Sequence, residues 1–289
     1  MKILILGNGF IAESLIRNLE SQGYDLHTYS RTYKSGLNCQ QSIGDILDFD
    51  TFVQVLKWRP QVIINTAWVT SYGKYEVDKS NSDYADFTIK LAAQLTRTDI
   101  EHLLVLGTCA EYGPQISPST ANVTELNPQS LYAREKVRAF NATREILENT
   151  DIRFSWPRIF QPYGPNQDPK RLIPTLIDAI RLNRPLNLDD VTTIRDWITT
   201  RDIARAISWI IKNPAPIELD IGTSYGHTNL EVLKNLETMM GNSKQYESYS
   251  EPISEKNTLL LVGKESPLFT LGWRPIDNLE SGLEWVLGC

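Results

Sequence analysis

The first half of the chain alternates between short apolar runs and longer segments in which apolar residues recur every three or four positions. Short apolar runs that end at turn residues are typical of buried strands, and the longer periodic segments are typical of helices. The predicted strands are residues 2–6, 25–29, 61–65, 102–107 and 152–156. A helical pattern follows residue 9, and the other predicted helices are residues 52–58, 82–95 and 131–148. Strands that alternate with helices in this way predict a parallel sheet covered by helices on both faces.

The pattern changes after residue 158, where turn residues become frequent. The predicted strands of this part are residues 193–198, 217–221 and 259–262, with an extended stretch at 186–188. Its predicted helices are residues 172–182, 201–211, 229–240 and 279–287. We therefore expect residues 1–160 to form a first domain, with 187–215 returning to it, and residues 161–289 to form mainly a smaller second domain. A cleft between the two would be available to a ligand.

Composition narrows the classes of function. The 289 residues carry a net charge of −6, whereas general nucleic-acid binders are usually basic, so nucleic acid is not an expected partner. No apolar run approaches the roughly 18 residues of a membrane span, which argues against membrane insertion. The three cysteines are scattered and imply no disulfide framework, so a cytoplasmic setting is expected. The three histidines are isolated, and no group has the spacing of metal ligands.

A glycine-rich turn separates the first predicted strand from the first predicted helix. The turn has the GxGxxA pattern and reads Gly7-Asn8-Gly9-Phe10-Ile11-Ala12. Small residues at these positions let the backbone approach a pyrophosphate, and the free N–H groups and dipole of the helix N-terminus favour negative charge. The pattern therefore predicts a dinucleotide site, the alternative being a tight strand-to-helix turn without a ligand.

The end of the second predicted strand bears on the choice of dinucleotide. Ser30 and Arg31 stand where an acidic residue would hold the hydroxyl groups of the adenosine ribose. An arginine without a carboxylate suits a 2′-phosphate better, which favours NADP over NAD; the alternative is a solvated surface charge. Polar or small residues also follow other strands, at Asp45, at 65–68 and at Thr108. Because parallel strands end at one edge of a sheet, these residues are expected to converge on one site.

Two segments have a tyrosine four residues before a lysine, Tyr132–Lys136 and Tyr75–Lys79. Four residues apart on a helix, the two side chains share one face, and an ammonium group beside a phenol lowers the pKa of the phenol toward working pH. A general acid is most effective under that condition. Tyr75 is expected in a loop, whereas Tyr132 begins a helix beside the strand that ends at Thr108. We therefore take Tyr132–Lys136 as the functional pair and the other spacing as coincidence.

Taken in order, these motifs resemble the extended short-chain dehydrogenase/reductases, in the branch of sugar-nucleotide epimerases, dehydratases and reductases. The resemblance spans nearly the whole chain and rests on residues 6–12, 44–46, 65–67, 108, 132 and 136, 158–165, 194–197 with 202, and 271–275. It implies a Rossmann fold, a doubly wound parallel α/β sheet with helices on both faces, beside a smaller C-terminal α/β substrate domain. The first domain would then bind NAD(P).

Candidate site residues follow from the strand ends and from the resemblance. Thr108, Tyr132 and Lys136 match the catalytic positions of the family. The residues expected to contact NAD(P) are Gly7, Asn8, Gly9, Phe10, Ile11, Ser30, Arg31, Asp45, Ile46, Ala67 and Lys136. The residues expected near the substrate are Trp68, Glu111, Gln161 (where the family usually has asparagine) and Arg195.

Three of the positions near the substrate have alternatives. In the family, an arginine at the position of Arg195 grips the diphosphate of the substrate; the alternative is an ion pair with Asp196 or another nearby acid. Trp68 and Tyr72 either wall the sugar site or only pack in the fold. Glu111 stands where the family usually has an apolar residue and faces either the substrate or the surface.

The expected reaction follows from which of the family's characteristic residues this chain has and which it lacks. Cys109 and Ala110 follow Thr108 where the 4,6-dehydratases carry an Asp-Glu pair, so elimination of water lacks its acid and base. The resemblance then implies hydride transfer to a 4-keto-(6-deoxy) sugar nucleotide, with Tyr132 as proton donor and Lys136 holding the nicotinamide ribose. The alternatives are an NAD-dependent sugar-nucleotide 4-epimerase and, in another class, a non-catalytic NADP-binding sensor or scaffold. Many relatives dimerise through helices corresponding to 82–95 and 131–148, so the resemblance suggests a homodimer.

Overall fold

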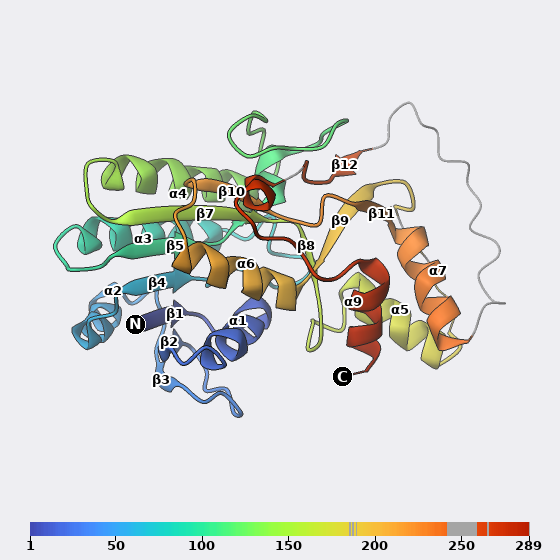
Figure 1. Ribbon diagram of the computed structural model, residues 1–289, viewed down its shortest axis with the longest axis horizontal. Coiled ribbons are helices and arrows are strands. Elements are labelled where there is room, and N and C mark those ends of the chain that lie inside the picture. The colour runs from blue at the N-terminus through green and yellow to red at the C-terminus, as the bar shows by residue number, and fades with distance from the viewer. Residues whose placement is uncertain (185, 187, 189, 242–258, 265, 289) are drawn as a thin grey trace.

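Within the part of the chain that the structure describes, eight parallel strands form the larger of two sheets. The structure, a computed structural model, describes residues 1–184, 186, 188, 190–241, 259–264 and 266–288. The strands of the larger sheet are β1 (Lys2–Leu6), β2 (Asp25–Ser30), β3 (Gln40–Ile43), β4 (Val62–Asn65), β5 (His102–Val105), β6 (Gly107–Thr108), β7 (Arg153–Ile159) and β10 (Glu218–Ile221). Their order is β10-β7-β5-β4-β1-β2-β3, with β6 beside β7 (Figure 1). The order reverses between β1 and β4, where ligands of such sheets bind.

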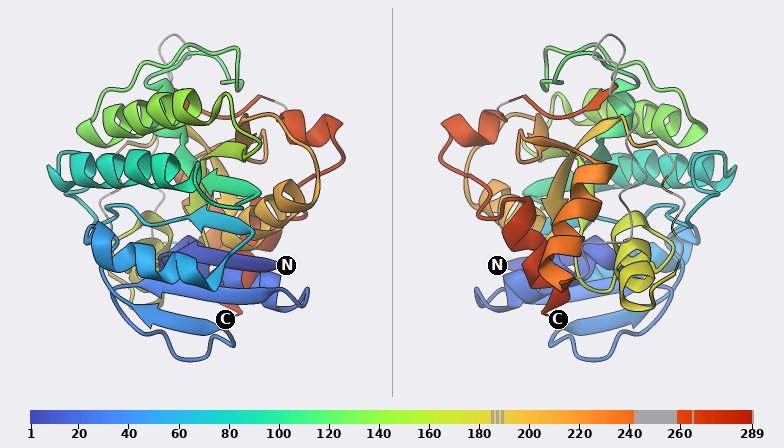
Figure 2. Two further views of the ribbon diagram at one scale, coloured as in Figure 1. Left: turned by 90° about the vertical axis from the view of Figure 1, so that its left-hand side faces the viewer. Right: turned by 90° about the vertical axis from the view of Figure 1, so that its right-hand side faces the viewer.

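Helices cover both faces of this sheet. On one face lie α1 (Phe10–Glu20) and α6 (Thr200–Lys212), and on the other lie α3 (Ser80–Leu95) and α4 (Leu131–Leu147) (Figure 2). A short helix, α2 (Phe49–Phe52), continues into a 3-10 turn, η1 (Val53–Trp58), where the sequence predicted one helix. Because both faces are covered, the central strands are continuous apolar runs in which every side chain of Ile3–Leu6 is buried.

The smaller sheet is built around β9 (Ile194–Thr199). β9 pairs in parallel with β8 (Gln161–Tyr163) and β12 (Leu260–Leu261), and antiparallel with β11 (Gly226–Thr228). The helices α5 (Leu172–Arg181), α7 (Asn229–Met240) and α9 (Leu279–Leu287) share a core with Tyr163 and Trp197, on the right in Figure 1. The remaining elements are η2 (Cys109–Tyr112) and α8 (Pro267–Thr270). No helix in these described ranges is long and apolar enough to cross a membrane.

This architecture confirms the predicted fold class, with one difference in how the chain returns to the larger sheet. The predicted return segment, residues 187–215, is divided: β9 belongs to the smaller sheet, whereas α6 packs on α1. β10, which lies beyond that segment, rejoins the larger sheet beside β7. A parallel neighbour of β7 requires a crossover connection, and α6 supplies it. Of the predicted stretch 186–188, residue 187 lies outside the described residues.

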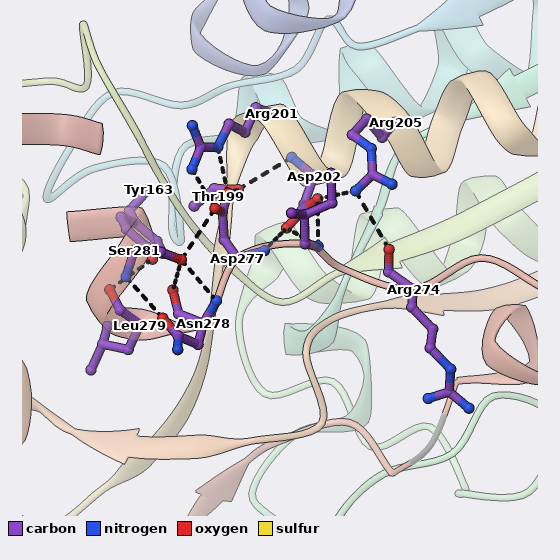
Figure 3. A network of polar contacts seen from close by, with 11 residues as sticks. Tyr163, Thr199, Arg201, Asp202, Arg205, Arg274, Asp277, Asn278, Leu279 and Ser281 are labelled. Atoms are coloured by element: carbon purple, nitrogen blue, oxygen red, sulfur yellow. Dashed lines mark hydrogen bonds and ion pairs between the residues drawn. The ribbon is translucent and has the colours of Figure 1, made fainter. Parts of the chain in front are cut away.

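A polar network around two buried carboxylates, Asp202 and Asp277, fastens the C-terminal segment to the start of α6 (Figure 3). The Asp202 carboxylate accepts hydrogen bonds from two consecutive backbone N–H groups just before α9, at 3.0 and 2.9 Å, and pairs with Arg205 at 2.6 Å. Asp277 accepts a hydrogen bond from Thr199 Oγ1 at 2.8 Å and pairs with Arg201. Since α6 also packs on α1, the network fixes the smaller sheet relative to the larger one.

Candidate active site

A cavity of about 680 Å³ lies at the carboxyl ends of the strands of the larger sheet. Its walls come from the turn after β1, the ends of β2, β4 and β6, the start of α4, and the segment between β8 and α5. The predicted site residues that line it are Gly7, Asn8, Gly9, Phe10, Ile11, Ser30, Arg31, Asp45, Ile46, Ala67, Trp68, Thr108, Tyr132, Lys136 and Gln161. Two predicted site residues, Glu111 and Arg195, are not among the described residues that line it.

The turn between β1 and α1 leaves space and free N–H groups for an anionic ligand. Gly7 has a φ of +95°, which side chains rarely adopt, and a Cβ there would lie 2.8 Å from Thr66 Oγ1. Gly9 precedes α1, and within the described chain no side chain caps this helix N-terminus. A Cβ at Gly9 would meet no atom within 4 Å, so the space beside it is open. The turn therefore fits the pyrophosphate of a dinucleotide, which would accept the N–H groups of the first helical turn.

The part of the cavity beside β2 has the properties of an adenosine site. Tyr29 is buried, and its hydroxyl group has no hydrogen-bond partner among the described residues. Gly44 lies against this ring, because a Cβ there would overlap the Tyr29 hydroxyl. Ser30 Oγ donates to the Thr32 carbonyl at 2.9 Å, whereas Arg31 is exposed and forms no ion pair in the described ranges. The Tyr29 hydroxyl could therefore bind a polar group of a dinucleotide, and the Arg31 cation could bind an anionic one.

Thr108, Tyr132 and Lys136 meet at the cavity as predicted from the strand ends. Thr108 is positioned by the parallel pairing of β6 with β7, and Tyr132 and Lys136 lie one turn apart at the start of α4. The Lys136 side chain is buried. Its Nζ donates to the Leu106 carbonyl at 2.6 Å and lies 3.8 Å from the centre of the Trp68 ring. The cavity wall thus combines a hydroxyl, a phenol and an amine.

The ionisation of this pair differs from the expectation. Burial raises the pKa of the Tyr132 phenol well above its ordinary value, and a hydrogen bond with Thr108 only partly offsets the rise. Burial lowers the pKa of the Lys136 ammonium group to about 7, and the negative charge of Glu111 acts in the opposite direction. The prediction that Lys136 lowers the Tyr132 pKa does not hold here, because the lysine donates to Leu106 and both groups are shielded from water. At neutral pH the phenol is therefore protonated.

Tyr75 and Arg171 line the cavity, although neither belongs to a motif predicted as functional. The Tyr75 ring meets the Tyr132 ring edge-on with centres 5.1 Å apart, and the Arg171 guanidinium lies 5.2 Å from the centre of the Tyr75 ring. Tyr72 packs on the same arginine but is half exposed and does not line the cavity. Lys79 lies at the N-terminus of α3, away from the cavity lining. One sequence feature could have indicated Arg171: it is a basic residue in the loop between β8 and α5.

Glu111 faces neither the substrate nor the surface, so both predicted alternatives are corrected. Its side chain is fully buried behind the cavity wall. The carboxylate accepts hydrogen bonds from the Thr108 backbone N–H at 2.9 Å and from Trp156 Nε1 at 3.1 Å, and pairs with Arg158 at 2.7 Å. The basic and polar donors of β7 compensate the desolvation of this charge.

Arg195 forms an ion pair with a nearby acid, which was the predicted alternative to substrate binding. The partner is Asp190, at 2.5 Å, and the second terminal nitrogen lies 3.3 Å from Asn229 Oδ1. Asp196 is not the partner because its carboxylate accepts hydrogen bonds from the Thr223 and Ser224 backbone N–H groups. In this structure the Arg195 guanidinium is thus held by Asp190, and Arg195 is not among the described residues that line the cavity.

The chain is similar to known proteins in sequence and, separately, in structure. The low-salt glycan biosynthesis protein Agl12 of Haloferax volcanii is 26% identical over 308 residues, which cover 98% of this chain and 96% of that protein. The UDP-glucose 4-epimerase of Thermotoga maritima, solved with UDP-glucose, has a TM-score of 0.85 at 19% identity, covering 100% of this chain and 98% of that one. The dTDP-glucose 4,6-dehydratase of Bacillus anthracis, solved with NAD, has a TM-score of 0.82 at 22% identity, covering 100% and 96%.

At these identities the two solved structures establish the fold. The sequence itself identifies the family, because the model of the NAD dependent epimerase/dehydratase family matches residues 3–222. This match extends from β1 through β10 and so includes the glycine turn and the walls that carry Thr108, Tyr132 and Lys136. It confirms the predicted resemblance: the chain belongs to the NAD dependent epimerase/dehydratase family.

Proposed function

We propose that this protein is an NADP-dependent oxidoreductase that reduces a 4-keto-6-deoxy sugar nucleotide, with Tyr132 as the proton donor. The observation that carries the proposal is that Thr108, Tyr132 and Lys136 line the same cavity as the glycine turn. NADPH, when bound, supplies the hydride. The side chains of the cavity supply the proton and position the substrate.

Each of the three side chains has a role that fits its ionisation. The Tyr132 phenol, which its raised pKa keeps protonated, donates its proton to the ketone oxygen as negative charge develops there. The Thr108 hydroxyl donates a second hydrogen bond to the same oxygen. Lys136, which lines the cavity, would hold the nicotinamide ribose. Reduction begins with a protonated phenol, which is the form that the burial of Tyr132 favours.

The residues after Thr108 argue against elimination of water. Cys109 and Ala110 both line the cavity. Burial raises the pKa of the Cys109 thiol to about 12, so this group stays neutral, and Ala110 has no ionisable group. Neither side chain removes a proton beside a ketone at neutral pH. This supports a substrate that already carries its ketone when it binds.

Within the family the alternative is an NAD-dependent sugar-nucleotide 4-epimerase. Two structural relatives support it, since one is a UDP-glucose 4-epimerase and the other was solved with NAD. The exposed Arg31 at the end of β2 supports NADP instead, because no carboxylate there would hold a ribose diol. A non-catalytic NADP-binding sensor or scaffold is the alternative of another class. The retention of Thr108, Tyr132 and Lys136 argues against it.

Incubation with NADPH and a panel of nucleoside-diphosphate 4-keto-6-deoxy sugars tests the proposal. Loss of NADPH in a one-to-one ratio with reduced sugar nucleotide is the expected result. Isomerisation of a sugar nucleotide without net loss of NADPH would assign the epimerase. Tight NADPH binding with no turnover of any sugar would assign the sensor or scaffold.

Arg31 should set the preference for NADP. We expect Arg31→Ala to weaken NADPH binding about 10- to 100-fold, the cost of losing charged hydrogen bonds to a 2′-phosphate, while NADH binding is unchanged. Fluorescence titration of both nucleotides measures this. Lys34→Ala is the matched control, because Lys34 is a nearby cation already paired with Glu13 at 2.6 Å. Wild-type protein that binds NADH more tightly than NADPH contradicts the assignment.

Arg171 is the cation that we propose to hold the diphosphate of the substrate. It lines the cavity and has no carboxylate ion-pair partner in the part of the chain that is described, whereas Arg195 is paired with Asp190. We expect Arg171→Ala to raise the KM for the sugar nucleotide about 10- to 100-fold without changing NADPH affinity. Arg195→Ala is the matched control and should leave this KM within a few-fold. A rise in KM for the Arg195 variant alone would reverse the two roles.

A further inference from the structure

The Glu111 carboxylate lies directly behind the Thr108 wall of the cavity and is completely buried. Oε1 accepts the Thr108 backbone N–H at 2.9 Å and the Trp156 indole N–H at 3.1 Å, and Oε2 accepts the Nε–H of Arg158 at 2.7 Å. Gly107 completes the arrangement, because a Cβ there would overlap the Trp156 indole. The buried carboxylate thereby holds the backbone that carries the Thr108 hydroxyl.

Trp156 links Glu111 to the predicted catalytic lysine. Lys136 Nζ lies over the Trp156 ring, 5.7 Å from its centre, while the N–H edge of the same ring donates to Glu111. A cation is attracted to the face of an indole, and hydrogen bonds in a low-dielectric interior polarise one another. An indole N–H that donates to a carboxylate therefore attracts the lysine more strongly than one that donates to water.

We propose that Glu111 is a positioning residue of the hydride-transfer site: its carboxylate fixes the backbone of Thr108 and, across the Trp156 indole, favours the charged form of Lys136. Its effect on turnover rests on the function proposed above, but its effect on the lysine does not. Because burial brings the Lys136 pKa to about 7 and Glu111 acts against that decrease, the carboxylate governs how much ammonium is present near neutral pH.

The neighbouring charges do not duplicate this effect. The titratable and charged groups around Glu111 are Cys109 and Tyr112 in its own turn, Arg158 on β7, Glu218 and Asp220 on β10, Asp196 on β9, and Tyr132 and Lys136 on α4. Glu218 pairs with the far side of Arg158 at 2.8 Å. Asp220, whose pKa burial raises to about 6, accepts from Tyr112 at 2.6 Å. Of the carboxylates, it is the charge of Glu111 that raises the Lys136 pKa.

Glu111→Gln tests the proposal because it keeps the size of the side chain and removes its charge. Loss of a negative charge favours the neutral amine, so the titration midpoint of Lys136 should fall below that of the wild-type protein. The midpoint is followed by ¹³C NMR of lysine-labelled protein, with the resonance assigned by a Lys136→Met variant. The alkaline limb of the pH profile of kcat, where Lys136 loses its proton, should move the same way.

Two further variants make the outcome decisive. Glu218→Gln also removes a carboxylate from Arg158 and should leave the Lys136 midpoint in place. Trp156→Phe keeps a ring beneath Lys136 but removes the indole N–H, so it should lower the midpoint and serves if Glu111→Gln does not fold. A folded Glu111 or Trp156 variant with the wild-type midpoint overturns the proposal. Since the titration needs neither NADPH nor substrate, failure of the sugar-nucleotide assignment would leave this test intact.

Discussion

A Tyr132→Phe variant should lose turnover by a factor on the order of 10²–10⁴, the usual contribution of a positioned general acid. The variant lacks the phenolic proton that the ketone oxygen receives, while the ring still packs edge-on against Tyr75 and Trp68. Affinity for NADPH should therefore stay close to that of the wild type. Steady-state kinetics with the accepted sugar nucleotide measure the first quantity, and fluorescence titration measures the second.

Tyr75→Phe is the matched control for this experiment. Tyr75 is the other tyrosine in contact with Tyr132 at the cavity, and its hydroxyl donates to Glu76 at 3.2 Å. Removal of that hydroxyl should change kcat by no more than a few-fold. If Tyr132→Phe retains wild-type turnover, the proton comes from another donor and the mechanism is wrong. If only the Tyr75 variant is inactive, the roles of the two tyrosines are exchanged.

An Arg158→Met variant should lose about 3–5 kcal/mol of its free energy of unfolding, the cost of breaking a buried ion pair on one side. The Arg158 side chain is fully buried between Glu111 and Glu218, and Glu111 is equally buried. Methionine fills part of the volume but leaves the Glu111 carboxylate without its cation. Urea unfolding at neutral pH, followed by circular dichroism, measures the loss.

Arg144→Met is the control for the loss of an arginine near the same groups. Arg144 also pairs with Glu218, at 3.6 Å, and lies 5.0 Å from the Phe140 ring, against 5.3 Å for Arg158. Its side chain is half exposed, so its removal should cost less than about 1 kcal/mol. Equal losses from the two variants would show that burial of the Arg158–Glu111 pair does not decide the stability of this region.

Much of the fold and of the cavity could be predicted because the residues concerned belong to local patterns. The helices predicted over 229–240 and 279–287 have those bounds in the structure, and each begins at a side-chain cap, Thr228 and Asn278. Gly7 follows β1 and Thr108 ends β6, and because both strands belong to the parallel sheet, the two residues lie at one edge. Tyr132 and Lys136 are four residues apart, so a helix at α4 is enough to place both side chains on one face.

The residues that escaped prediction are positioned by contacts between distant segments. From the sequence alone, Glu111 resembles an exposed polar residue. The partners that bury it, Trp156 and Arg158, follow it by 45 and 47 residues. Tyr75 and Arg171 reach the cavity from loops, and the path of a loop cannot be predicted from hydrophobic periodicity. Arg195 was expected at the diphosphate, but the chain turns at Asp190, with a φ of +54°, and brings that carboxylate to the guanidinium.

The network around Asp277 also bears on what part of the chain can fold alone. Phe269 and Trp273 belong to the core beneath α1 and α6, and Asp277 holds Thr199 and Arg201 at the start of α6. The core of the dinucleotide half is therefore completed by residues that come some fifty positions after the family match ends at residue 222. We therefore expect that cutting the chain after β10 would leave the core of the larger sheet incomplete.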